Sequence, residues 1–503
     1  MSGLLLLPLD DRPVNLDTPQ LLAALIGESL CTPPRALLGR FLQPGQPDAL
    51  AEWLPRQTAD IGIISLDMLA YGGLVASRTP AVSVPEALRR LDALREMKRR
   101  NPGVRLYAFN VIMRLTITGA DAETRAAGRE IFRYSVLRDQ AERLGDAGAA
   151  AELPAVIARI PPALLEAYLA ARARNHAVNR AALELLADGV LDFLALVQED
   201  TAPAGLHLTE QAALTALAGG RVAPERWRLY AGTDEAGQTL LARAVLQRDG
   251  ITTPVVIRLR DEQAADFPAL YEDVPLRETV RRHVDAVGAT AGTNGITLAA
   301  HTFTPPQPDL FDLPSLPAPT WEAALEAYPA ADVARWLTAL DGPLAVADLA
   351  YCNGGDPHLL SALFTHRQLD SVYSYAGWNT AGNTLGTALA HSVLRAAALE
   401  RGATAAMDAA QQAALFIRIL DDGLYQSIVR PWVMSSLQEF GASALNLGSA
   451  TSAIEARVDA AMQALWREFV ARHPRAAALS RPFRAVLPWG RLFETRIELR
   501  EGA

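Results

Sequence analysis

The chain has 503 residues, 50% of them hydrophobic and 20% charged, which is the balance of a globular protein with a large core and excludes a disordered chain. Its formal net charge is −9, so we expect no nucleic-acid partner, because an acidic chain repels a phosphate backbone. Its two cysteines, Cys31 and Cys352, exclude a disulfide framework and are typical of a reducing compartment.

Short apolar runs alternate with long runs rich in Ala, Leu and Arg, a pattern typical of parallel α/β proteins. Most of the short runs are continuously apolar, as expected for strands that are covered on both faces. In chain order, the eight predicted strands are residues 4–9, 61–66, 105–112, 191–197, 227–231, 254–259, 296–300 and 344–347, and residues 372–375 are a ninth candidate.

The first of these runs has no basic flank and leads directly into Asp10 and Asp11, which predicts a strand rather than a signal peptide. No charge-free stretch reaches the length of a membrane-spanning helix. We therefore expect a cytoplasmic protein with no membrane partner. The sequence leaves open whether the chain forms a homo-oligomer.

Helix signals lie between the strands. Ser83 and Glu86 form a capping box that predicts a helix through Arg100. Eight strands before a mainly helical C-terminal region predict a (β/α)₈ barrel, with two doubly wound α/β domains as the alternative. We expect an α/β catalytic domain over 1–303, a proline-rich linker or long loop over 304–320, and the last β/α units with a helical region that completes the site over 321–503.

Polar side chains follow most of the predicted strands. Because parallel strands end on one side of a barrel or sheet, we expect these side chains to surround a shared hollow. The candidates are Asp10, Asp11, Arg12, Asn15, Asp67, Tyr71, Arg78, Asn110, Arg114, Asp200, Asp234, Glu235, His301, Asp348, Tyr351, Asn353, Trp378, Asn379 and Asn383. Trp378 beside Asn379 and Asn383 favours a sugar ligand, because the ring covers a C–H face while amides bind hydroxyls.

Asp234 and Glu235 form the sharpest single signal. Neighbouring carboxyls can have their pKa values pushed apart, which gives the acid and the base that glycoside hydrolysis needs. The string Gly232-Thr233-Asp234-Glu235 resembles the Gly-Asp-Glu strand end of retaining hexosaminidases. That resemblance implies Glu235 as the proton donor and Asp234 as its partner.

Several motifs are missing. The chain has no GxGxxG after its first strand, no P-loop, no Gly-x-Ser-x-Gly elbow and no cysteine–histidine cluster with zinc spacing. We therefore expect no cofactor. The carboxylates of Asp10 and Asp348 are suitable ligands for a hard divalent metal, so the sequence leaves open whether one binds.

The whole chain resembles the bacterial domain-of-unknown-function family 4127. The strings that carry the resemblance are PLDDRPVN (8–15), SLDMLAYGGLVASR (65–78), GTDEAG (232–237), ADLAYCNGGD (347–356), YAGWNTAGNTLG (375–386), DDGLYQSIVR (421–430) and LPWGRLFE (487–494). The resemblance implies no established activity, but it adds Arg430, Trp489 and Arg491 to the candidate site. The family carries two aspartates where this chain has Glu199-Asp200, which favours Asp200 as the functional residue.

We therefore expect a glycoside-processing hydrolase with a carbohydrate substrate, in which Asp234, Glu235 and Asp200 are catalytic and the other candidates bind substrate. The first alternative is a divalent-metal-dependent sugar or polyol isomerase or lyase, with Asp10, Asp200, Asp234 and His301 as ligands. The second alternative is a sugar-binding protein that is not a catalyst.

Overall fold

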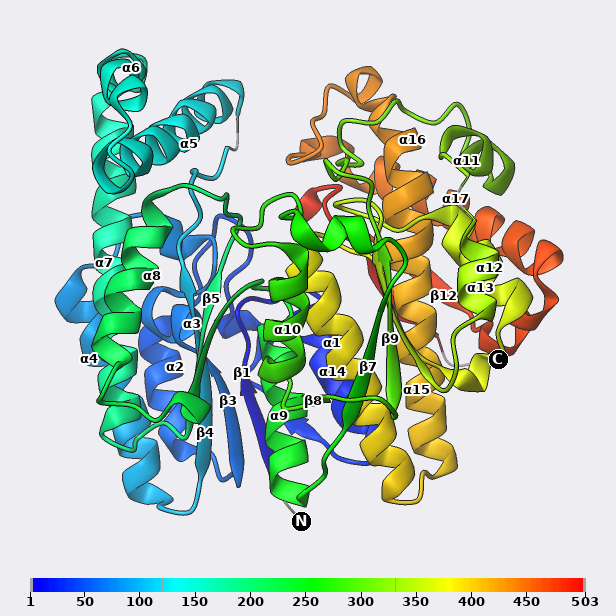
Figure 1. The fold of residues 1–503 in the computed structure, drawn as a ribbon, viewed down its shortest axis with the longest axis horizontal. Helices are drawn as coiled ribbons and strands as arrows, with labels where there is room; N and C mark the ends of the chain where they lie inside the picture. The colour runs from blue at the N-terminus through cyan, green and yellow to red at the C-terminus, as the bar shows by residue number, and fades with distance from the viewer. Residues whose placement is uncertain (1–2, 120, 331, 501–503) are drawn as a thin grey trace. The chain divides into compact units, whose positions relative to one another are not determined.

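The computed structural model describes residues 3–119, 121–330 and 332–500 (Figure 1). These residues form two compact units. The first unit comprises the described residues up to 20 together with 28–244 and 271–274. The second comprises 21–27, 245–270 and the described residues from 275 onward.

The first unit contains a six-stranded parallel sheet with the order β2-β1-β3-β4-β5-β6. Its strands are β1 (Leu4–Leu7), β2 (Leu30–Cys31), β3 (Ile61–Ser65), β4 (Arg105–Ile112), β5 (Phe193–Gln198) and β6 (Trp227–Ala231). The helices up to residue 249 are α1 (Asp17–Leu25), α2 (Pro47–Trp53), α3 (Leu66–Tyr71), α4 (Val84–Arg100), α5 (Ala122–Arg143), α6 (Ala147–Ile157), α7 (Pro162–Ala187), α8 (Leu206–Ala218) and α9 (Ala236–Asp249).

Helices cover both faces of this sheet. Leu5, Leu106 and Leu194 share one hydrophobic cluster with buried residues of α4 and α7. On the opposite face, the guanidinium of Arg243 in α9 lies 4.0 Å from the ring centroid of Phe193. The capping box predicted from Ser83 and Glu86 begins α4, which ends at Arg100 as expected.

The second unit contains a five-stranded parallel sheet with the order β11-β10-β9-β7-β8. Its strands are β7 (Pro254–Leu259), β8 (Thr290–Ala291), β9 (Ile296–Thr302), β10 (Leu344–Leu349) and β11 (Val372–Ala376), and a separate antiparallel pair is formed by β12 (Phe483–Val486) and β13 (Arg496–Leu499). Its helices include α10 (Leu276–Ala286), α11 (Trp321–Ala327), α12 (Val333–Thr338), α13 (Pro357–His366), α14 (Ala381–Glu400), α15 (Ala405–Arg418), the π-helix η7 (Ile419–Val429), α16 (Arg430–Met434) and α17 (Thr451–Arg472).

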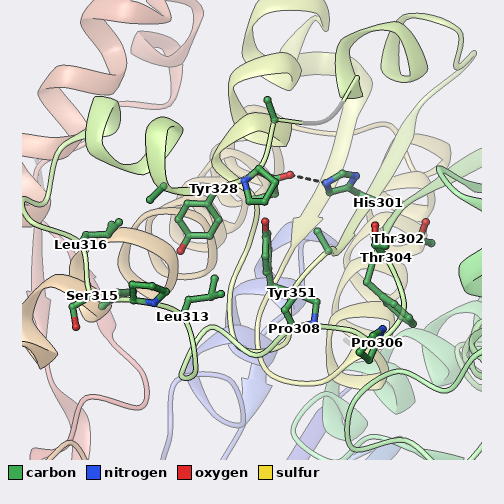
Figure 2. A pocket seen from close by; sticks show the side chains of 18 of the residues that line it. His301, Thr302, Thr304, Pro306, Pro308, Leu313, Ser315, Leu316, Tyr328 and Tyr351 are labelled. Atoms are coloured by element: carbon green, nitrogen blue, oxygen red, sulfur yellow. Dashed lines mark hydrogen bonds and ion pairs between the residues drawn. The ribbon is translucent and has the colours of Figure 1, made fainter.

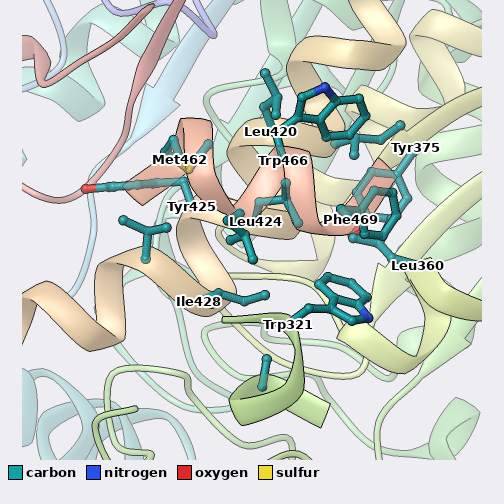
Figure 3. Close-up of a cluster of buried hydrophobic side chains, with 14 of the residues drawn as sticks. Trp321, Leu360, Tyr375, Leu420, Leu424, Tyr425, Ile428, Met462, Trp466 and Phe469 are labelled. Carbon is teal, nitrogen blue, oxygen red and sulfur yellow. The ribbon is translucent and has the colours of Figure 1, made fainter. Parts of the chain in front are cut away.

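The helical part of the second unit has its own aromatic core (Figure 3). The rings of Trp321 and Phe469 meet edge to face with centroids 4.7 Å apart, and Phe469 stacks on Trp466 at 5.6 Å. Tyr425 of the π-helix is buried in the same cluster, and its hydroxyl donates to the Leu492 carbonyl at 2.9 Å. This core joins α11, α17 and the π-helix into one packed body.

The predicted α/β class with parallel strands is confirmed, and each of the nine predicted strands overlaps an observed one. The predicted closed barrel is not observed: within the described residues, the parallel strands form two separate open sheets. β6 ends the first sheet, whereas β7 pairs with β8 and β9 in the second. A continuously apolar run identifies a buried strand but does not specify its neighbour, so the pattern fitted the alternative of two doubly wound domains nearly as well as a barrel.

Strand order is the same in both units. Numbered from the first strand of each sheet, both follow the order 2-1-3-4-5, and the first sheet adds a sixth strand. In such sheets the strand order reverses between strands 1 and 3. Ligands bind beyond the carboxyl ends of the strands at that switch point. The switch points lie between β1 and β3 in the first unit and between β7 and β9 in the second.

The proline-rich segment 304–320 lies within the second unit and connects β9 to α11 without a helix or strand of its own. In the described part of the chain, no single helix is both long and apolar enough to cross a membrane. The bent pair α6 and α7 passes that criterion only when the two helices are taken together, across an angle of 119°.

Candidate functional site

Four predicted residues meet in the first unit around the buried guanidinium of Arg12. Its Nε donates to both carboxylate oxygens of Asp10, at 3.0 and 2.9 Å. Its Nη1 and Nη2 donate to Asp234, at 3.1 and 2.5 Å. Asn15 completes the cluster by donating to Asp10 at 2.8 Å. One cation thus holds two buried carboxylates from residues far apart in the chain.

Glu235 turns back onto its own loop. The Thr233 backbone N–H donates to its carboxylate at 2.8 Å, and the side chain is buried. A Cβ at Gly232 would lie 2.3 Å from a Glu235 carboxylate oxygen, and Gly232 has φ +135°, so only glycine fits there. The predicted acid pair is therefore engaged within the protein, Asp234 by Arg12 and Glu235 by the turn that leads into α9.

A second charged cluster follows β5. Arg78 pairs with Glu199, and Arg114 pairs with Asp200 at 3.0 Å. Burial raises the pKa of Glu199, which the nearby guanidinium of Arg78 opposes. Arg78 also donates to Thr118 at 2.8 Å. Arg78, Arg114 and Asp200 are thus gathered as predicted, but in compensated ion pairs.

Asp67, Tyr71 and Asn110 lie in the interior of the first unit. The Val111 N–H donates to Asp67 at 2.8 Å, and burial raises the pKa of Asp67 to about 8. The Arg174 guanidinium lies 4.1 Å from the Tyr71 ring centroid. Asn110 donates to a neighbouring buried asparagine at 2.8 Å. Asp11 is only partly buried, and a guanidinium nitrogen of Arg35 lies 3.8 Å from its carboxylate.

The second unit contains a cavity of about 760 Å³ whose wall is mainly proline, leucine and aromatic (Figure 2). Three of its polar lining residues lie at strand ends: Arg260 follows β7, His301 lies near the end of β9, and Tyr351 follows β10. The cavity therefore includes the switch point between β7 and β9. Its volume and its mixture of apolar wall and few polar groups are typical of a site for a small organic molecule.

His301 and Asp356 form a buried pair at this cavity (Figure 2). His301 Nε2 lies 2.8 Å from an Asp356 carboxylate oxygen, whose partner oxygen accepts the His358 N–H at 2.8 Å. Because a carboxylate accepts hydrogen bonds, the shared proton belongs to Nε2 and leaves Nδ1 as an acceptor. Nδ1 has no hydrogen-bond partner among the described residues. Burial lowers the pKa of His301, which favours the neutral ring.

Two tyrosines stand next to this pair. The rings of Tyr328 and Tyr351 meet edge to face with centroids 5.2 Å apart (Figure 2). The Tyr328 hydroxyl donates to the Ser427 carbonyl at 2.6 Å and is therefore occupied. Burial raises the pKa of Tyr351, so its hydroxyl stays protonated and can donate to a ligand.

Asp348 supports the loop that carries Asp356. Its carboxylate accepts the Asp356 N–H at 2.6 Å and the Tyr375 hydroxyl at 3.2 Å. It is fully buried, and burial raises its pKa well above the ordinary value. Asp348 is therefore a positioning residue for the His301–Asp356 pair rather than a group that lines the cavity.

The predicted sugar-binding loop and the late arginines are parts of the packed interior. Trp378 is 4% exposed, and its ring meets Phe493 edge to face at 5.7 Å. Asn353 and Asn379 both have φ +66°, and the Asn353 N–H donates to the Asn379 carbonyl at 2.9 Å. Such strained backbone persists where the surrounding structure fixes it. The side-chain amide of Asn383 donates to the Thr380 hydroxyl at 3.2 Å within the first turn of α14.

The guanidiniums of Arg430 and Arg491 both bind groups inside the second unit. Arg430 donates to Gln426 at 2.5 Å and to the Asn353 carbonyl at 2.7 Å. Arg491 makes two bonds of 2.9 Å to Glu494 and lies 4.4 Å from the Trp489 ring centroid. Groups of the protein itself thus engage both guanidiniums that the sequence placed in the candidate site.

Arg260, Tyr328 and Asp356 line the cavity but are not among the residues predicted for the site. Arg260 directly follows the strand predicted at 254–259, so the rule applied to the other strands would have found it. Within the described residues, no group of three or more His, Cys, Asp or Glu side chains could hold a metal ion.

No curated protein and no solved structure matches this chain. A family model described as protein of unknown function (DUF4127) matches residues 4–498, nearly the whole length. The resemblance seen in the seven sequence strings is confirmed, and the chain belongs to the DUF4127 family.

Proposed function

We propose that this protein is an enzyme that hydrolyses a small organic substrate in the cavity of the second unit, with His301 as the general base. The observation that carries the proposal is the His301–Asp356 pair, in which Nε2 is bound at 2.8 Å and Nδ1 is an acceptor without a partner among the described residues. A histidine oriented by a carboxylate is a common proton-transfer device.

The proposed reaction is a single displacement by water. His301 Nδ1 takes a proton from the water while the water oxygen bonds to the electrophilic atom of the substrate. The bond from that atom to the leaving oxygen breaks, and the imidazolium returns the proton to the leaving oxygen. Asp356 stabilises the imidazolium, and Tyr351 donates a hydrogen bond to the substrate.

A carbohydrate remains the proposed substrate class. The Tyr328 and Tyr351 rings both line the cavity, and aromatic rings suit the C–H face of a sugar. Hydrolysis of a glycoside by Asp234 and Glu235 stays a prediction from the sequence. It has less support, because that chemistry needs an acid free to protonate a leaving oxygen, whereas Arg12 and Thr233 engage these two carboxylates.

The test is a turnover screen on 4-nitrophenyl glycosides, esters and phosphates, followed by kinetics of variants on the best substrate. We expect His301→Asn to lower kcat/KM by about 10²–10⁴-fold, the usual range for general-base catalysis. His366→Asn is the matched control, because His366 is exposed at the end of α13. If His301→Asn kept full activity and Glu235→Gln lost activity, the Asp234–Glu235 pair rather than His301 would be catalytic.

The pH profile separates a base from a merely structural histidine. A base acts when deprotonated, and burial lowers the pKa of His301, so kcat/KM should fall only below about pH 6.5, the ordinary value for histidine. Asp356 favours the charged ring, so Asp356→Asn should move the acid limb to still lower pH while lowering the maximal rate. An unchanged limb in Asp356→Asn would contradict the assigned pair.

A further inference from the structure

Arg260 is held by its backbone at the switch point of the second sheet. It is the first residue after β7, and its N–H donates to the Ala300 carbonyl of the neighbouring strand β9 at 2.9 Å. Arg260 lines the cavity together with His301 and Thr302, and its guanidinium donates to the Thr302 carbonyl.

The charge of Arg260 is not compensated by the protein. Its Nη2 makes one long bond of 3.3 Å to the Thr302 carbonyl, and its Nε is buried without a partner. Among the residues that the structure describes, no carboxylate forms an ion pair with it. Arg12 and Arg78, by contrast, each hold at least one carboxylate. A guanidinium without a carboxylate partner pairs readily with a carboxylate or phosphate group of a ligand.

The carboxylate in the cavity wall does not supply this pairing. Asp356 accepts from the His301 ring and from the His358 N–H at the start of α13. Arg260 acts on the ring of His301 in the opposite sense to Asp356, because its charge disfavours the imidazolium. An anion bound to Arg260 would cancel that effect and make His301 a stronger base when the cavity is filled.

We infer that Arg260 binds a carboxylate or phosphate group of the substrate, whose apolar or aromatic body fills the proline-rich part of the cavity. The inference rests on the proposed function for the identity of the cavity as an active site. Binding of the anion itself does not require turnover. The substrate class is thereby narrowed to organic anions, such as an acidic sugar or a phosphorylated one.

The experiment measures binding of simple probes to the full-length protein by calorimetry. Benzoate and phenyl phosphate carry the two anionic groups on the same ring, benzyl alcohol is the neutral analogue, and inorganic phosphate lacks the apolar body. We expect one aromatic anion to bind at least tenfold more tightly than benzyl alcohol and than inorganic phosphate. The stronger of benzoate and phenyl phosphate identifies the group.

Arg260→Gln should weaken the binding of that probe at least tenfold. Arg258→Gln is the matched control, because Arg258 lies exposed on the same strand and donates to the Ile257 carbonyl. Circular dichroism and the thermal midpoint check that both variants fold. The inference is overturned if neither aromatic anion binds better than benzyl alcohol, or if folded Arg260→Gln binds as the wild type does.

His301→Asn separates the two proposals. It should retain binding of the anionic probe while losing turnover. Arg260-dependent binding in a protein whose activity is unaffected by His301→Asn would support the anion site and reject the catalytic proposal. Turnover of neutral substrates that depends on His301, without anion binding, would reject the anion site alone.

Discussion

Arg12 and Asp234 lie face to face inside the first unit, with Nη1 3.1 Å from one carboxylate oxygen and Nη2 2.5 Å from the other. The two residues are 222 positions apart in the chain. The same guanidinium holds Asp10, so the cluster contains two anions and one cation away from water. The buried carboxylate of Asp234 is therefore accounted for by its ion pair with Arg12. The stability of the first unit should in turn depend on Arg12.

Replacing Arg12 should therefore destabilise the first unit strongly. Arg12→Met leaves the carboxylates of Asp10 and Asp234 buried without their cation, which should cost about 3–5 kcal/mol. Urea unfolding followed by fluorescence measures the loss. The control is Arg56→Gln, which removes an exposed pair with Glu52 at 3.5 Å and should cost at most about 1 kcal/mol. Equal effects of the two variants would contradict the role of the cluster.

Asp67 should make stability depend on pH in a defined direction. Its pKa is raised to about 8 by burial, whereas an unfolded aspartate titrates near 3.9. Between about pH 4 and 8 the folded chain keeps a proton that the unfolded chain has released, so the free energy of unfolding falls as pH rises, by at most about 1.4 kcal/mol per pH unit.

Asp67→Asn removes this titration and keeps an oxygen for the Val111 N–H. The variant should therefore gain stability relative to the wild type between pH 5 and pH 9, as measured by denaturant midpoints at both values. A difference that is the same at pH 5 and pH 9 would show that Asp67 is already ionised in the folded state.

Gly355 should be intolerant of a side chain because of the groups that support His301. A Cβ there would lie 2.2 Å from the Tyr375 hydroxyl and 2.8 Å from an Asp348 carboxylate oxygen. Gly355→Ala must displace Asp348 or the loop that it holds, which should lower kcat/KM at least tenfold together with the thermal midpoint. Gly103→Ala is the control, because a Cβ there would lie 3.7 Å from Asn101 Oδ1, an ordinary contact, and the variant should leave both measurements unchanged.

The strands could be predicted because each buried strand carries its own apolar run, as 105–112 does for β4. Their pairing could not, since the side chains of β6 and β7 do not specify which strands lie beside them. The two-residue strands β2 and β8 were missed because a pattern so short carries no periodicity. The hairpin of β12 and β13 was hidden for a similar reason in a region read as helical.

The site was predictable only in part. The rule that parallel strands end on one side correctly brought Asp10 and Asp234 together across the chain. The role of a carboxylate at a strand end depends on the donors that face it. The spacing of residues in the sequence does not reveal that Asp234 pairs with Arg12 rather than with a substrate. His301 was noticed at a strand end, but its partner Asp356 is 55 residues away and became visible only through the fold.

The role of Asp348 as a hydrogen-bond acceptor can be tested by two substitutions. Asparagine should preserve its function, whereas alanine should not. Burial raises its pKa well above the ordinary value, which favours the protonated side chain, and Asp348→Asn mimics that form. The amide oxygen can still accept the Asp356 N–H and the Tyr375 hydroxyl, whereas Asp348→Ala removes both bonds and leaves the donors unmet. We expect Asp348→Ala to lose about 2–4 kcal/mol of stability and at least tenfold in kcat/KM, with Asp348→Asn close to the wild type in both. Equal damage by the two variants would mean that the negative charge of Asp348, rather than its hydrogen bonds, is what the loop requires.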